Sequence, residues 1–288
     1  IDSDAATSVT IKGAGDVDIN SAALEATVIT VDGSTSTGDI DVTLGNVAAD
    51  VSNDVDTFDQ VDVTVTTGSG DDDVSLTNVV TDREILVNTG AGDDVVTIGS
   101  ALVNSSSTLA GDVINGGTGT DTLRGLSATL GGHATTTGVS GFEKIAITDT
   151  HDQSLDVADF GTGITTVQLE VGGSTSGTII FGAGESSVVE FASVSAGAIT
   201  ITDGSSTATT DAATFTITDT DNADVFAGQA ITSTGIETLT INTTNTKSTS
   251  QTAVEMDFGA IGISADTGGT AKLVLTGGNK ADVGVITA

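Results

Sequence analysis

Apolar and polar residues alternate in short runs along most of the chain, and the alternation has a period of two. Val63 and Val65 are flanked by polar residues, as are Phe215 and Ile217. A period of two places the apolar side chains on one face of a β-strand. The same pattern predicts strands at 144–148, 166–171, 177–181, 187–191, 198–202, 214–218, 238–242 and 272–276. The pattern therefore predicts an all-β protein built from short strands.

Helical periodicity is weak throughout the sequence. The best candidate is the run S-A-A-L-E-A at 21–26. A helix this short does not persist in water unless other elements pack against it. We therefore expect at most a few helical turns.

Turns rich in glycine and aspartate recur between the strands, and three of them lie within 67–124. They read T-G-S-G-D-D-D-V-S from Thr67, T-G-A-G-D-D-V-V-T from Thr89 and G-G-T-G-T-D-T-L-R from Gly116. The last matches in full the Ca²⁺-binding nonapeptide G-G-x-G-x-D-x-U-x of β-helical repeats, and the first two replace only its first glycine. Two weaker copies begin at Gly13 and Ser36.

The spacing of these turns suits the coils of a solenoid. Aligned on Gly15, Gly38, Gly70, Gly92 and Gly119, they are 23, 32, 22 and 27 residues apart. About two further short strands fit between successive turns, as in a parallel β-helix, and the longest interval needs an insertion, placed at 49–60. The predicted fold is a parallel β-helix or β-solenoid with little helix.

The coils are expected to differ along the chain. Residues 1–125 carry the Gly/Asp turns, and 126–288 continue the solenoid largely without the motif, with a soft boundary in the loop-like stretch 125–138. Another G-G-N-K-A-D-V turn begins at Gly277, close to the last residue. This predicts that the sequence is a fragment of a longer chain.

The Gly/Asp turns hold the candidate metal ligands. Glycine permits the positive-φ conformations that expose backbone carbonyls, and aspartate adds a charged oxygen. Stacked coils would bring these oxygens together around a Ca²⁺ ion, which takes six to eight oxygen ligands. The predicted calcium-site residues are Gly68, Gly70, Asp71, Asp72, Asp73, Gly90, Gly92, Asp93, Asp94, Gly117, Gly119 and Asp121.

Other acidic turns leave two interpretations open. At 15–18 and 38–41, Val17 and Ile40 occupy the aspartate position of the motif, so either a metal site or an ordinary solvated turn fits. The run D-T-D-N-A-D at 219–224 begins like an EF-hand loop but lacks its glycine and terminal glutamate in the required positions. An irregular calcium site and a solvated turn both remain there.

The net charge of the chain limits the kinds of partner that it could bind. The chain has 40 acidic and 7 basic residues and a net charge of −33. Nucleic acid and anionic lipid would be repelled, whereas Ca²⁺ would offset the repulsion between clustered carboxylates, so folding is predicted to depend on calcium. The absence of cysteine excludes disulfides and thiolate metal sites. No apolar run is long enough for membrane insertion by a helix.

Catalytic chemistry has little support in the sequence. His133 and His151 are the two histidines, and there is no G-x-S-x-G motif. His151 adjoins Asp152, but neighbours on a strand point to opposite faces, so we expect a surface histidine. A β-helix polysaccharide lyase would need a basic residue beside Ca²⁺, and clustering of Arg83 with Arg124 is the arrangement that would supply it. The sequence favours a non-enzymatic protein.

The chain resembles the repeat-bearing part of RTX proteins, specifically the calcium-dependent surface-layer (S-layer) proteins of Gram-negative bacteria. The resemblance rests on the nonapeptide and its near copies, on the paired segments G-F-E-K-I from Gly141 and G-I-E-T-L from Gly235, and on the acidic, Cys-free, Thr/Gly-rich background. The motifs are singly spaced, whereas the family repeats them in tandem.

The resemblance implies type I secretion to the cell surface, folding on contact with external Ca²⁺, and self-association into a lattice or filament, with cell-surface polysaccharide as a further partner. The leading hypothesis is thus a structural subunit of a calcium-stabilised surface layer. A segment of a giant RTX adhesin, acting as spacer or ligand-binding module, is the alternative, and a lyase is the third.

Overall fold

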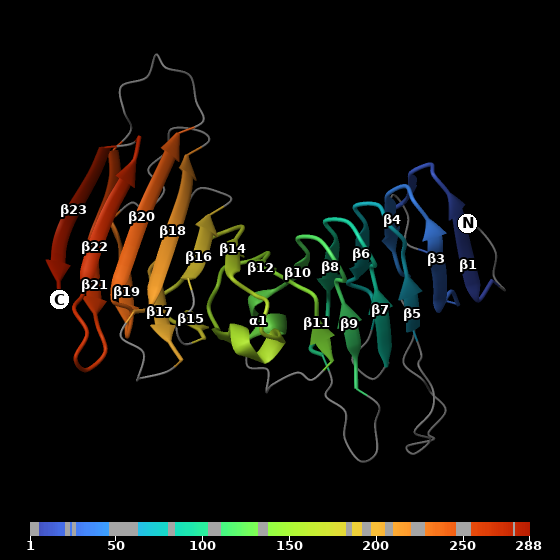
Figure 1. Ribbon diagram of the computed structural model, residues 1–288, viewed down its shortest axis with the longest axis horizontal. Helices are drawn as coiled ribbons and strands as arrows, with labels where there is room; N and C mark the ends of the chain where they lie inside the picture. Colours follow the sequence, from blue (N-terminus) through green and yellow to red (C-terminus); the bar gives the residue numbers. More distant parts are fainter. Residues whose placement is uncertain are drawn as a thin grey trace. The chain divides into compact units, whose positions relative to one another are not determined.

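The computed structural model is nearly all-β, and its parallel strands coil into a β-solenoid (Figure 1). This confirms the predicted fold class. The structure describes residues 6–20, 24, 27–45, 63–79, 84–102, 111–131, 138–182, 186–191, 197–204, 210–219, 228–245, 255–278 and 280–288. Within these residues the helical elements are α1 (Ser127–Leu130) and the 3₁₀ turn η1 (Val157–Phe160), as expected from the weak helical periodicity.

The chain divides into two compact units. Unit 1 comprises Ile1–Thr129, His133–Ile145 and Asp159–Ile164, and unit 2 comprises Leu130–Gly132, Ala146–Ala158 and Thr165–Ala288. Strand β12 (Lys144–Ile147) has residues in both units.

Each coil of unit 1 contributes one strand to each of two parallel ladders. The first ladder runs in the order β1-β3-β5-β7-β9-β11, and the second contains β2-β4-β6-β8-β10. The first comprises β1 (Ser8–Gly13), β3 (Thr30–Ser36), β5 (Val63–Thr66), β7 (Ile85–Asn88), β9 (Val113–Asn115) and β11 (Val139–Ser140). The second comprises β2 (Val17–Ile19), β4 (Ile40–Thr43), β6 (Asp73–Leu76), β8 (Val95–Ile98) and β10 (Thr122–Gly125).

Unit 2 repeats this plan with longer strands. One parallel sheet runs β13-β15-β17-β19-β21-β23, and the other ladder contains β14-β16-β18-β20-β22. The first comprises β13 (Ser154–Asp156), β15 (Thr178–Phe181), β17 (Ile199–Asp203), β19 (Gln229–Thr234), β21 (Glu255–Ser264) and β23 (Lys280–Thr287). The second comprises β14 (Thr166–Leu169), β16 (Ser186–Phe191), β18 (Ala212–Asp219), β20 (Thr238–Asn245) and β22 (Lys272–Gly277).

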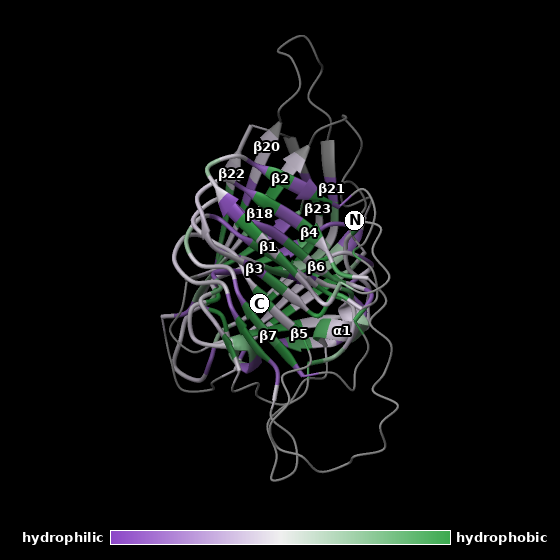
Figure 2. Ribbon diagram, turned by 90° about the vertical axis from the view of Figure 1, so that its right-hand side faces the viewer, coloured by the Kyte–Doolittle hydropathy of each residue, from purple (hydrophilic) through white to green (hydrophobic). Residues whose placement is uncertain are grey.

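The apolar face of each strand points into the solenoid. Val63, Val65, Phe215 and Ile217 are fully buried, as their alternation with polar residues predicts. Figure 2 shows apolar and polar segments alternating along the strands. The eight strands predicted after residue 143 all form, each with boundaries within about three residues of those expected.

The coils stack in the predicted register. A Cβ placed on Gly70, Gly92 or Gly119 would collide with the backbone of the aligned glycine one coil earlier, Gly38, Gly70 and Gly92 respectively. The column therefore needs glycine at each level, because a side chain would push adjacent coils apart. The insertion placed at 49–60 lies outside the described residues. Among the described helices, none combines the length and apolar character needed to cross a membrane.

Candidate metal sites

An inner ladder of carboxylates runs along the turns of unit 1. Asp72, Asp94 and Asp121 are 0 to 1% exposed. Each accepts a hydrogen bond from a backbone N–H one coil earlier: Ile40 N–H donates to Asp72 Oδ1 at 2.7 Å, Asp72 N–H to Asp94 Oδ1 at 2.8 Å, and Asp94 N–H to Asp121 Oδ1 at 2.9 Å. Asp121 N–H in turn donates to Glu143 Oε2 at 2.9 Å. The predicted motif aspartates are thus stacked one coil apart.

The inner ladder of carboxylates begins at the first turn that has an aspartate in the aspartate position of the motif. Ile40 holds the aspartate position of an earlier turn, and its side chain is fully buried in the core. It supplies an N–H to the ladder but no carboxylate. At Val17, one coil earlier again, the N–H donates to the carbonyl of Asp39 instead. The two weaker turns therefore lack this ladder's ligand.

A second, outer ladder lies on the exposed side of the same turns, and its hydrogen bonds point in the opposite direction along the stacked coils. Here each backbone N–H donates to the carboxylate of the preceding coil: Asp39 to Asp16, Asp71 to Asp39, Asp93 to Asp71, and Thr120 to Asp93, at 2.8 to 3.2 Å. Asp16 and Asp39, in the two weaker turns, belong to this ladder together with the predicted ligands Asp71 and Asp93.

A third row of carboxylates lies on the sheet that follows the turns. Asp18 on β2 pairs with Asp41 on β4, and Asp41 pairs with Asp73 on β6. Like charges directly opposite each other on neighbouring strands are destabilising. The predicted ligand Asp73 therefore belongs to a different row from Asp72, because successive residues of a strand point to opposite faces.

Burial changes the proton affinity of these carboxylates. Desolvation raises the pKa of Asp94 to about 6, although the backbone hydrogen bond from the Asp72 N–H opposes this shift. It raises the pKa of Asp72 and Asp121 in the same way. Burial, followed by the charge of Asp41, raises the pKa of Asp73. The ionised form is disfavoured in the absence of a cation.

The glycines of the motif act in two ways. Gly90, Gly92, Gly117 and Gly119 have positive φ, as expected for turns that expose carbonyls. Gly68 and Gly70 do not, although a Cβ on either would collide with the backbone of the coil below. The expectation of positive φ is therefore wrong for the first turn, where close coil contact alone requires glycine.

Threonine replaces the first glycine of the motif for an identifiable reason. Thr67 and Thr89 are buried, and their hydroxyls donate to the carbonyl oxygens of Thr89 and Gly116, each at 2.6 Å. Each threonine thereby ties one coil to the next. A carbonyl oxygen has two lone pairs, so these oxygens keep one acceptor position for another partner.

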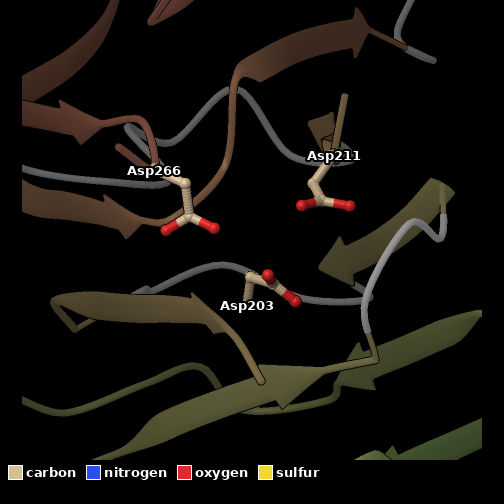
Figure 3. A group of neighbouring side chains, drawn as sticks. All are labelled: Asp203, Asp211 and Asp266. Atoms are coloured by element: carbon tan, nitrogen blue, oxygen red, sulfur yellow. The ribbon is translucent and has the colours of Figure 1, made fainter. Parts of the chain in front are cut away.

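Unit 2 contains a group of three aspartates that sequence reasoning missed. One carboxylate oxygen from each of Asp203, Asp211 and Asp266 lies within 4.8 Å of the others (Figure 3). Asp203 ends β17, Asp211 precedes β18, and Asp266 follows β21. Asp203 and Asp211 lie in the turn between β17 and β18, and Asp266 lies in the turn between β21 and β22, two coils later. Such a set of oxygens could hold a hard divalent cation.

Glu237 joins this aspartate group through the backbone. Its Oε2 accepts the Asp211 N–H at 3.0 Å, and its Oε1 accepts the Asp266 N–H at 2.9 Å. A Cβ on Gly235 would lie 3.2 Å from Asp266 Oδ1 and 3.3 Å from Asp203 Cβ, so a side chain there would crowd the group. The one available signal in the sequence was the paired G-[FI]-E segment at Gly235.

The remaining sequence candidates have mixed outcomes. His151 is 1% exposed, so the expectation of a surface histidine is wrong. Its backbone bridges to Gly173, and its ring lies against Gly177, where a Cβ would sit 2.6 Å from the ring carbon Cδ2. Glycine at position 177 leaves room for the ring. Burial lowers the pKa of the His151 imidazole. Arg83, His133 and most of 219–224 lie outside the described residues.

Comparison with known proteins gives no relative: no family model, curated protein or solved structure matches the chain.

Proposed function

We propose that this chain is a structural, non-enzymatic part of an extracellular surface layer or filament that calcium stabilises. The observation that carries the proposal is the inner ladder, in which Asp72, Asp94 and Asp121 are removed from solvent. Burial of an ionised carboxylate is costly unless hydrogen bonds or a cation compensate it. The backbone N–H groups compensate part of this cost at each level.

Calcium is the cation that the chemistry favours. The candidate ligands are all oxygens, from carboxylates and turn carbonyls, and the chain has no cysteine for softer metals. With a net charge of −33, the solenoid repels itself, and bound divalent cations would reduce that repulsion. The aspartate group of unit 2 adds a second place where a cation would relieve close carboxylates.

The solenoid itself supports a scaffold role. Each coil contacts mainly its neighbours, so the fold presents long, regular faces suited to repeated contacts with other subunits. The resemblance to RTX surface-layer proteins adds type I secretion and the cell surface of a Gram-negative bacterium to the proposal. Self-association, with cell-surface polysaccharide as a further partner, completes it.

Circular dichroism and size-exclusion chromatography with light scattering, each with Ca²⁺ and with EGTA, test the proposal. We expect EGTA to reduce strand content and to dissolve assemblies that Ca²⁺ forms, visible also by electron microscopy. Unchanged strand content and mass in EGTA would contradict it. A calcium-dependent fold that stays monomeric at high concentration would instead favour a spacer segment of an adhesin.

A further inference from the structure

Two turns of the form Gly-x-Glu have the same structure in the two units. Gly141 and Gly235 have φ of 71° and 73°. In each turn the glutamate carboxylate accepts the N–H of an aspartate one coil earlier, Asp121 for Glu143 and Asp211 for Glu237. The carbonyls of the same aspartates accept the N–H of the residue after the glutamate, at 3.1 and 3.0 Å. The glutamates thus occupy equivalent positions.

In unit 2 this turn adjoins the three converging aspartates. Glu237 is 5% exposed, and its two carboxylate oxygens hold the backbone at Asp211 and Asp266, two of the three members. Three carboxylates therefore converge at this corner, and the carboxylate of Glu237 binds the backbone of two of them. Carboxylate charges this close repel one another, and a cation bound between them would offset that repulsion.

In unit 1 the equivalent turn closes the inner ladder, and a separate observation there points to a ligand. Asp121 is fully buried, its Oδ1 accepts the Asp94 N–H, and its Oδ2 has no hydrogen-bond partner among the described residues. A buried carboxylate oxygen without a donor is costly. Glu143 is the next carboxylate along the ladder, and its charge acts on Asp121.

We propose that both Gly-x-Glu turns are divalent-cation sites, in which Glu143 acts with Asp121 in unit 1 and Glu237 acts with Asp203, Asp211 and Asp266 in unit 2. The inference rests on the proposed calcium-stabilised function. It extends that function to glutamates outside the nonapeptide and to a unit that lacks the motif. All donors are oxygens, so the ligand class is a hard divalent cation such as Ca²⁺.

Glutamine variants separate this role from a purely structural one. In Glu143→Gln the amide oxygen still accepts the backbone N–H of Asp121, whereas the charge is lost. In Glu237→Gln the single amide oxygen can accept the N–H of either Asp211 or Asp266, so one backbone hydrogen bond is lost together with the charge. Glu190→Gln is the matched control, because Glu190 lies in the β16 row between Gln168 and Thr216. Isothermal titration with Ca²⁺ and Tb³⁺ luminescence would measure stoichiometry and affinity.

We expect each glutamine variant to lose about one bound ion per chain, or to weaken one class of site about tenfold or more, with the control unchanged. Wild-type stoichiometry and affinity in both variants would overturn the inference. If the wild-type chain bound no Ca²⁺ at all, the proposed function would fail with it.

A variant that loses strand content without calcium calls for a second test. Asp121→Asn and Asp203→Asn remove charge from the same two sites and leave the Gly-x-Glu turns intact. Unchanged binding in these variants would also overturn the inference, and loss of an ion in each would support it.

Discussion

The same kind of corner holds acidic side chains in both units, but the carboxylates are arranged differently. In unit 1 each inner aspartate lies one coil from the next and accepts a backbone N–H. In unit 2 one carboxylate oxygen from each of Asp203, Asp211 and Asp266 converges to within 4.8 Å of the others, from two turns that lie two coils apart. The first arrangement spreads charge along the solenoid, and the second concentrates it at one point.

The difference lies in how the charges are compensated. In the ladder, each backbone dipole favours the ionised carboxylate, which partly offsets burial. In the group of unit 2 the three carboxylates lie close enough to repel one another, and Asp211 is buried as well. We therefore expect the ladder to depend on close coil stacking and the group to depend on a cation.

The largest effect is expected where coil stacking itself is broken. Gly92→Ala places a Cβ against the carbonyl oxygen of Gly70, at a φ of 138° that an L-residue rarely adopts. Backbone strain and overpacking together should cost about 2 to 4 kcal/mol of unfolding free energy. Chemical denaturation measures this.

Gly15→Ala is the control for this substitution, because nothing lies within 4 Å of its Cβ position and its φ is not strained. It should change stability by less than about 1 kcal/mol. Equal losses of unfolding free energy in the two variants would show that close contact between the aligned glycines does not determine how the coils stack.

The next effect, that of Asp94→Asn on stability, should have opposite signs with and without calcium. Asp94→Asn keeps an oxygen that can accept the Asp72 N–H, but it removes the carboxylate charge. Burial raises the pKa of this carboxyl group to about 6. In EGTA at pH 7 the variant should gain about 1 to 2 kcal/mol. In saturating Ca²⁺ it should be less stable than wild type. Thermal unfolding in both conditions tests this, and destabilisation in EGTA would contradict the proposed burial penalty.

The sequence predicted the solenoid because two strong periodicities coincide in it. Alternation of the Val63–Val65 type marks one face of a strand, and the glycines at coil-like spacing mark where coils stack. In unit 2 the strands β13, β19, β21 and β23 were not predicted, and all four belong to the sheet that runs from β13 to β23. β21 has Gly259 and Gly262 within it, and β19 carries a register shift between Gln229 and Ile231, so their alternation is broken.

The candidate sites were predictable in unit 1 alone. Their residues repeat in one short motif, and stacking puts equivalent positions in contact. Asp203, Asp211 and Asp266 hold non-equivalent positions, so their convergence follows from the register of β17, β19 and β21 and from no local pattern. The burial of His151 was missed for a similar reason, since the glycine that makes room for its ring, Gly177, lies one coil away.

Proton binding should distinguish the units in the calcium-free protein. The pKa of Asp94 is raised from 3.8 to about 6, so the folded state binds more protons than the unfolded state between these values. The penalty from Asp94 is fully present above pH 6 and is relieved as pH falls toward 3.8. The stability advantage of Asp94→Asn in EGTA should therefore shrink from pH 7 to pH 5.

His151 in unit 2 should behave in the opposite way. Burial lowers its pKa below 6.5, so the unfolded state binds the proton more readily. Its neutral form contributes to stability above pH 6.5, and this contribution is lost as pH falls below that value. The stability of wild type relative to His151→Gln should decrease over the same range. If the stability of wild type relative to Asp94→Asn and relative to His151→Gln changed with pH in the same direction, the expected difference between the units would be disproved.

The smallest effect is expected in the third row of carboxylates of unit 1, which comprises Asp18, Asp41 and Asp73. Burial, then the charges of Asp18, Asp39 and Asp16, raise the pKa of Asp41, which pairs with Asp18 and Asp73 on the neighbouring strands. Asp41→Asn should therefore gain about 0.5 kcal/mol in EGTA at low ionic strength. The gain should fade in high salt, because exposed charges are screened there. Glu190→Gln in unit 2 removes a charge flanked in its row by Gln168 and Thr216, so it should show no such gain. A matching, salt-sensitive gain from Glu190→Gln would mean that net charge, and not the aspartate row, sets the repulsion.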